Sequence, residues 1–248
     1  MIVSRAAIVG ILLASSVFIG GQTYATFISQ PITVGSITIT TASALPDTPP
    51  VQNTLRLAAQ ADTELYQHSP EKNAGRKRQI NVISRADWNA RILIRYDLSV
   101  LPVDATIQSC TLHMYLSEAS NFGSREHGIF HIAQHAADWS EGDHLFSTSS
   151  PGESSWLWYS RSKEWDEFGG DAAQEPTAVT ATGTSNQVWK EWDLTPDCQS
   201  GGIQSWLLRD IQEDNPHYTI RTEYQTRESY YEDQQPYLAV SYTIPEAH

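Results

Sequence analysis

The chain alternates apolar and polar residues over most of its length. Between residues 90 and 98, Ile92, Ile94 and Tyr96 share one phase, whereas Arg91 and Arg95 take the other. A period of two predicts a half-buried β-strand. Strands are expected at 55–66, 79–84, 90–99, 106–119, 127–136, 188–195, 218–224 and 236–244. Because polar loops separate these segments, the pattern predicts an all-β chain, a single antiparallel β-sandwich of jelly-roll type.

One segment departs from this alternation. In residues 201–211, Ile203, Trp206, Leu207 and Ile211 recur at helical spacing. This spacing predicts one short helix near the end of the domain.

The first residues are typical of a secretory signal. Arg5 provides a positive charge, residues 6–19 are apolar, and small residues precede a cleavage site near Ala25. A retained tether is the alternative, but the apolar run is shorter than the roughly 20 residues that span a bilayer, which favours cleavage. We therefore expect a secreted or cell-surface protein, with residues 1–25 as the signal peptide.

Residues 26–54 combine a strand pattern with a proline-rich spacer, ahead of a sandwich domain at 55–248. The strand is expected at 32–41, and it leaves its backbone groups unpaired unless it docks somewhere. It either pairs with its own domain or remains a tail, or it completes the sheet of another subunit and forms a homo-oligomer. The apolar residues of this candidate donor strand are Ile32, Val34, Ile37 and Ile39.

The chain contains two cysteines, Cys110 in a predicted strand and Cys198 in a polar connection. In an oxidising compartment they either form one disulfide or stay as two buried thiols.

Charge and motifs restrict the class of function. The net charge of −13 argues against nucleic acid as a partner, because a phosphate backbone requires a basic patch. We find no nucleophile elbow, zinc-protease motif or phosphate loop, so we expect no enzyme activity. A polysaccharide-degrading enzyme that uses a pair of carboxylates remains an alternative.

Several fragments occur in an order that resembles one family. They are QADTELY followed by KNAGRKRQINV, RILIRYDLS, WSEGD, SWLW followed by EWDEFGGD, WKEWDLT, and the closing PYLAVSY. This order resembles DNRLRE-domain proteins, which include disaggregatase-related repeats and a class of carbohydrate-binding modules. The resemblance implies an extracellular β-sandwich that contacts polysaccharide. The chain departs from the family in lacking an accompanying catalytic domain and in having Cys198 where an aliphatic residue is usual.

The aromatic block at 155–171 contains the candidate ligand-binding residues. An indole stacks on the apolar face of a sugar ring, and nearby cations pair with uronate carboxylates. Trp165 is surrounded by charged residues and is expected to be the exposed tryptophan. For Trp156 and Trp158, a structural role in the fold is favoured over contact with a ligand. The candidate ligand-binding residues are Trp165, Arg161, Lys163, Trp156 and Trp158.

Turn carboxylates are candidates for a structural calcium ion, although the expected function requires no cofactor. Calcium prefers hard oxygen ligands, and the alternative is that these groups are ordinary turn residues. The candidates are Asp138, Glu141, Asp143 and Asp171.

Three functional hypotheses follow from these patterns. The first is a non-enzymatic, carbohydrate-binding protein whose partner is a polysaccharide or cell-surface glycan. The second is a self-assembling filament or surface-layer subunit that uses the 32–41 strand. The third is the polysaccharide-degrading enzyme.

Overall fold

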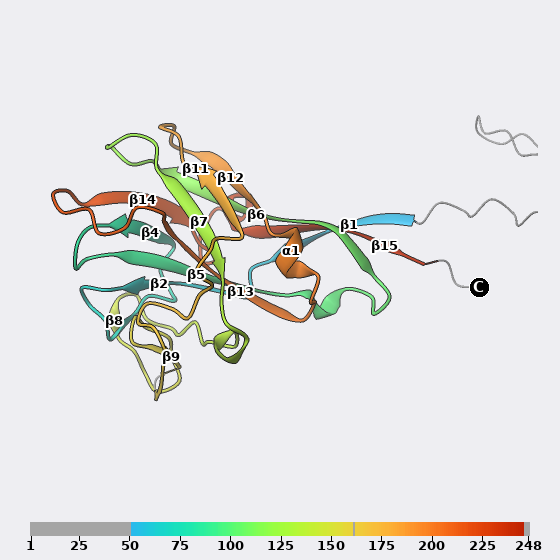
Figure 1. Cartoon of the computed structure of the whole chain (residues 1–248), viewed down its shortest axis with the longest axis horizontal. Coiled ribbons are helices and arrows are strands. Elements are labelled where there is room, and N and C mark those ends of the chain that lie inside the picture. The colour runs from blue at the N-terminus through green and yellow to red at the C-terminus, as the bar shows by residue number, and fades with distance from the viewer. Residues whose placement is uncertain (1–50, 161, 246–248) are drawn as a thin grey trace, which may run out of the picture. The chain divides into compact units, whose positions relative to one another are not determined.

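The alternation in the sequence becomes a set of antiparallel strands in the computed structural model, which describes residues 51–160 and 162–245 (Figure 1). The predicted all-β sandwich is confirmed for this part of the chain. The signal peptide, the 32–41 donor strand and Arg161 lie outside the described residues.

Eleven strands form one curled hydrogen-bonded network. Their order is β1-β15-β6-β14-β4-β5-β13-β7-β11, while β12 pairs with β6 and β2 pairs with β5. The strands are β1 (Val51–Ala58), β2 (Ala61–Tyr66), β4 (Gln79–Ser84), β5 (Ala90–Asp97), β6 (Thr106–Glu118), β7 (Glu126–His131), β11 (Ala178–Ala181), β12 (Val188–Asp193), β13 (Ile203–Asp210), β14 (Ile220–Gln225) and β15 (Tyr237–Ile244).

Short elements complete the connections. Two small ladders join β3 (Lys72–Asn73) to β8 (Ser147–Thr148) and β9 (Trp158–Ser160) to β10 (Lys163–Glu164). The helical elements are α1 (Thr195–Cys198) and the 3-10 turns η1 (Leu98–Val100), η2 (Gln134–Ala136) and η3 (Glu232–Gln234). No helix among the described residues is long and apolar enough to cross a membrane.

The apolar side chains form two main cores. The first core lies inside the sandwich and contains inward residues of β5, β6, β13, β14 and β15. The second core lies on the outer face of β2, β5, β13 and β7, where residues 132–172 cover the sheet. We call these residues the covering segment; its ends meet in a β-bridge between Ile132 and Ala172. Its β8 and β9 portions lie below β2 and β5 in the view of Figure 1.

The predicted helix at 201–211 is wrong, because this segment forms the interior strand β13. β13 pairs with β5 on one edge and β7 on the other. Trp206 and Leu208 enter the first core, whereas Leu207 enters the second. A strand buried on both faces has no polar phase, so its apolar residues lose the alternation that identifies strands.

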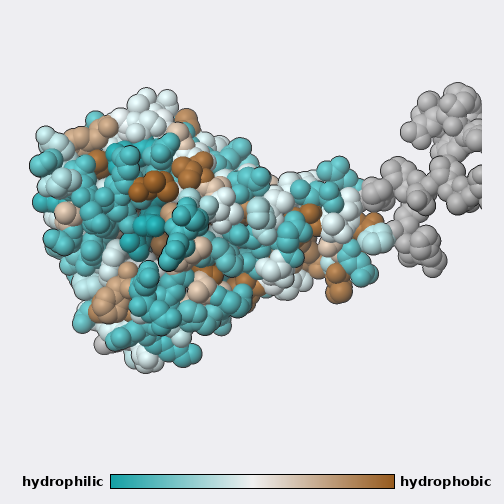
Figure 2. Space-filling model, viewed as in Figure 1, coloured by the Kyte–Doolittle hydropathy of each residue, from teal (hydrophilic) through white to brown (hydrophobic). Residues whose placement is uncertain are grey.

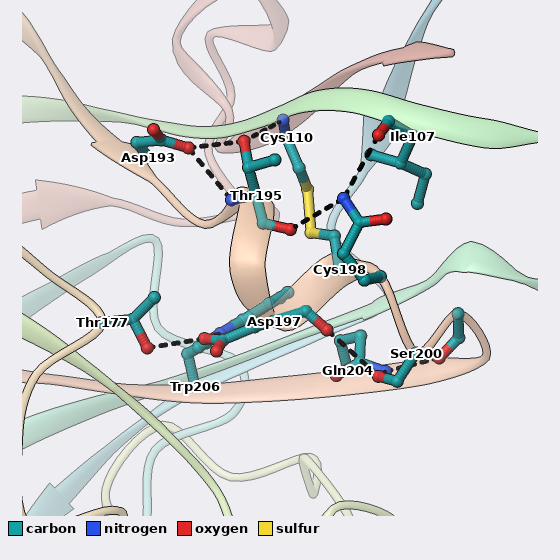
Figure 3. The surroundings of a disulfide bond; sticks show 12 residues. Ile107, Cys110, Thr177, Asp193, Thr195, Asp197, Cys198, Ser200, Gln204 and Trp206 are labelled. Carbon is teal, nitrogen blue, oxygen red and sulfur yellow. Dashed lines mark hydrogen bonds between the residues drawn. A yellow bond between two sulfur atoms is a disulfide. The ribbon is translucent and has the colours of Figure 1, made fainter. Parts of the chain in front are cut away.

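The two cysteines form the Cys110–Cys198 disulfide, which confirms the first of the two alternatives (Figure 3). It joins β6 to α1 with a Cα separation of 6.4 Å. The same contact is reinforced by the backbone N–H of Cys110, which donates to Thr195 Oγ1 at 2.9 Å. Asp197 of α1 accepts from the indole N–H of Trp206 at 2.8 Å, so the helix is tied to the core strand β13 as well.

Replacing both cysteines by alanine is expected to lower the free energy of unfolding by about 2–4 kcal/mol, because the bond closes a loop of 88 residues in the unfolded chain. Urea denaturation of the variant and of the reduced wild-type chain measures this loss. An unfolding free energy equal to that of the oxidised wild type would contradict a stabilising role for the bond.

Candidate functional site

Trp165 is buried, so the expectation that it is exposed is wrong. Its side chain is 2% exposed within the second core. The indole N–H donates to the carbonyl oxygen of Ser155 at 2.8 Å, and the ring lies 5.5 Å from that of Tyr159. An indole held in this way has no free face for a sugar.

The other residues of the aromatic block do not assemble a ligand site around Trp165. Trp156 is also in the second core, with the guanidinium of Arg91 4.8 Å from its ring centre. Trp158 lies partly exposed on β9, and Lys163 is exposed on β10. The Lys163 ammonium lies 5.9 Å from the ring centre of Tyr159. Of the candidate ligand-binding residues that the structure describes, only Trp158 and Lys163 are therefore positioned near solvent.

Asp171 belongs to a turn that supports Trp156. Its carboxylate accepts a hydrogen bond from the Glu167 backbone N–H at 2.7 Å and lies 3.0 Å from the His135 imidazole. Gly169 has a φ of +88°, and a Cβ there would lie 2.7 Å from Trp156 Cζ2. The turn therefore needs glycine for both its conformation and its close approach to the ring.

The other predicted calcium ligands, Asp138, Glu141 and Asp143, line one open pocket of about 690 Å³. They have different partners within it, however. Asp138 pairs with Arg95 at 3.2 Å, and the Asp143 carboxylate lies 3.7 Å from the imidazole of His144. Glu141 turns towards β2, where it accepts from the backbone N–H of Asp62 at 2.7 Å. The three carboxylates therefore do not converge on one ion.

The outer face of β6, β12 and β15 carries a group of partly exposed aromatic side chains, which we call the aromatic strip. The strands place these rings together because Trp189 pairs with Tyr115, and Tyr237 pairs with His113. Alternate residues of the same strands point into the first core. The members of the strip are His113, Tyr115, Trp189 and Tyr237.

Trp189 is the central ring of the aromatic strip. It meets Tyr115, His113 and Tyr237 at interplanar angles of 77°, 78° and 70°. Tyr237 is held between His113, which stacks on it at 4.3 Å, and the guanidinium of Arg56 at 3.6 Å. All three contacts are edge-to-face, and no described ring stacks parallel on Trp189.

The aromatic strip continues into a polar depression of about 540 Å³, which we call the amide groove. Tyr115 belongs to both features, and Tyr231 from the η3 region, 61% exposed, lines the groove as a second aromatic residue. The amide side chains that line it are Gln79, Asn186, Gln187, Gln225 and Gln234.

The electrostatics of this face are mild. Burial lowers the pKa of His113, and the nearby carboxylate of Glu191 partly opposes this effect. The imidazole is therefore mainly neutral at pH 7. The two acids of the groove have partners, since Glu118 pairs with Arg221 at 2.9 Å and Glu223 accepts from Ser117 Oγ at 2.8 Å.

This arrangement suits an uncharged ligand with many hydroxyl groups. Amide side chains both donate and accept hydrogen bonds, and an aromatic face packs against the apolar face of a pyranose. The volume of the amide groove lies within the roughly 300–1,000 Å³ of small-ligand sites.

The prediction from sequence missed this face, although part of its signal was present. His113 and Tyr115 lie out of phase with the apolar residues of β6, as does Trp189 relative to the buried Trp192. The pairing of β6 with β12 across some 70 residues of chain brings these rings together, and this pairing is not visible in either segment alone.

Comparison of the chain with protein-family models and with curated proteins finds no match. The resemblance to DNRLRE-domain proteins therefore stays a prediction from the fragments quoted above.

His127 and His131 lie on β7, and His135 follows in η2. The imidazole of His127 is 1% exposed and lies 2.9 Å from the hydroxyl of Tyr224. Burial lowers the pKa of His127 to about 3, and the charges of Arg125 and Lys190 add to this effect. The imidazole is thus a neutral part of the interior.

Acid is expected to weaken the fold through His127. Below the ordinary pKa of 6.5 the unfolded chain binds a proton that the folded imidazole does not. The free energy of unfolding should therefore fall by about 1.4 kcal/mol per pH unit as the pH drops below 6.5, until about pH 3. Urea denaturation between pH 7 and 4 measures this slope, which should be shallower in His127→Gln. Equal slopes in the two proteins would contradict the low pKa of His127 in the folded chain.

Proposed function

We propose that this protein is a secreted or cell-surface, non-enzymatic β-sandwich that binds polysaccharide on the outer face of β6 and β12. The observation that carries the proposal is the continuity of the aromatic strip with the amide groove through Tyr115. Aromatic rings beside a polar groove present apolar surfaces and hydrogen-bonding groups on one face of the sheet, as a glycan chain requires.

Two further observations support an extracellular setting and a particular glycan class. The disulfide fits an extracellular protein, because cytosolic thiols are kept reduced. The net charge of −13 and the paired acids of the groove favour a neutral glycan over a uronate polymer. In Figure 2 the hydrophobic residues on the visible side form separate small patches on a largely hydrophilic surface.

Removing a ring of the aromatic strip is expected to weaken glycan binding at least tenfold. A glycan array first identifies a ligand, and calorimetry then compares the wild type with Trp189→Ala and Tyr115→Ala. Each substitution removes a stacking surface that contributes about 1.4 kcal/mol or more.

Phe168→Ala is the matched control, because this aromatic residue is 55% exposed in the covering segment and outside the groove. Unchanged affinity in both strip variants, or equal losses in the control, would refute the site. An array without any bound glycan would refute the proposed function.

Self-assembly is the second candidate function, and the position of β1 favours it. β1 stands at one end of the strand order and pairs only with β15 among the described strands. One edge of this eight-residue strand is therefore not paired with any other described strand, and an edge of this kind can accept an additional strand. The apolar 32–41 segment, which precedes β1 in the chain, has the composition to occupy such an edge in a neighbouring subunit.

Deleting residues 26–50 is expected to convert any oligomer to monomer while leaving the sandwich folded. Multi-angle light scattering measures the mass of the mature and truncated chains at high concentration, and circular dichroism checks the fold. A mature chain that is already monomeric would contradict the assembly function.

A further inference from the structure

Three carboxylates meet where β2 contacts two loop segments. Asp62 lies on β2, Glu141 on the covering segment, and Glu228 on the turn that follows β14. One carboxylate oxygen from each residue lies within 4.8 Å of the others. Two ligands on opposite sides of a calcium ion are at most about 5 Å apart, because each Ca–O distance is about 2.3–2.6 Å.

When the three groups are ionised, two of their oxygens are buried without a hydrogen-bond donor. They are Asp62 Oδ1 and Glu228 Oε2, and among the described residues no other carboxylate oxygen is in this state. Asp62 as a whole is only 1% exposed. A buried carboxylate oxygen without a partner is costly unless it meets a cation or a proton.

The nearest cation leaves these two oxygens free. The guanidinium of Arg227 lies 2.7 Å from Glu141 Oε2 and 3.5 Å from Glu228 Oε1. Its backbone N–H donates to Asp62 Oδ2 at 2.8 Å. The Arg227 side chain is 39% exposed, so its charge is partly screened by solvent. Arg95 adds a second positive charge near Glu141, but it pairs with Asp138 at 3.2 Å. When all four of these carboxylates are ionised, they still outnumber the two guanidinium groups.

In two other acidic groups, the central carboxylates already have hydrogen-bond partners within the protein. Glu153, which lies near Asp143 and His144, accepts hydrogen bonds from the backbone N–H groups of Asp143 and Ser150. Asp171, in the remaining group, is held by its turn as described above. The carboxylates at the centres of both groups are therefore already occupied within the protein.

We propose that Asp62, Glu141 and Glu228 bind one calcium ion. All three ligands are hard oxygens, and the group contains no histidine or cysteine that would favour a transition metal. Glu141 also lines the open pocket of about 690 Å³, which gives an ion a route from solvent.

A bound cation would offset the repulsion among the three carboxylates and would tie β2 to the covering segment and to the turn after β14. The amide groove shares none of the three ligands, so the ion has a structural role separate from glycan binding.

Equilibrium dialysis of the purified full-length chain against radioactive calcium chloride, after treatment with EDTA, tests the site. The wild type is expected to bind one equivalent. Adding calcium chloride at about 100 times the dissociation constant is expected to raise the melting temperature by about 5–10 °C. Absence of binding at 5 mM calcium chloride would overturn the proposal.

Asp62→Asn and Glu228→Gln keep the shape of each side chain and are expected to lose the bound equivalent. In EDTA they should be at least as stable as the wild type, because they remove repulsion. Asp143→Asn is the matched control and should bind calcium normally. Retention of the ion by both ligand variants would place it elsewhere and overturn the proposal. If Asp62→Asn does not fold, Glu228→Gln decides alone.

Discussion

Burial of both faces of the sheet formed by β2, β5, β13 and β7 is the constraint on which the rest of the structure depends. Neighbouring residues Leu207 and Leu208 enter different cores, so each face of β13 needs a cover. The opposite sheet covers one face, and the covering segment covers the other. That segment has little regular structure, and its large rings fill the second core, chiefly those of Trp139, Trp156 and Trp165. Rings that resemble a ligand platform in the sequence are thereby used as interior packing.

The sequence predicts half-buried strands better than it predicts fully buried strands and long-range pairing. Half-buried strands such as β6 and β15 are evident from their alternation, because one face is exposed to solvent and the other is buried. β13 does not show this alternation because neither of its faces is exposed to solvent, and its apolar residues also fit a helical period. The disulfide was one of two open alternatives, since the approach of Cys110 to Cys198 depends on how α1 returns to β6. Local chemistry is visible in the chain, whereas long-range pairing is not.

The candidate sites show the same contrast between local chemistry and long-range pairing. Charged neighbours in the sequence suggested an exposed Trp165, but the hairpin of β9 and β10 turns the indole inward while its neighbours stay in solvent. Conversely, Trp189 and Tyr115 form a surface only because two distant strands pair. Among the acids, Glu141 was identified as a candidate ligand, but its partners Asp62 and Glu228 come from the first and last thirds of the chain. Residue type indicates the chemistry of a site, and topology determines its members.

The disulfide also has a consequence for the integrity of the chain. The covering segment has many exposed positions between Asp143 and Phe168, where a protease finds accessible backbone. All of them lie between Cys110 and Cys198 in the sequence. A cut in this region leaves the two fragments covalently joined, and β6 and β12, which carry most of the aromatic strip, remain on opposite sides of the cut but in one molecule. The sandwich can therefore be nicked without being divided.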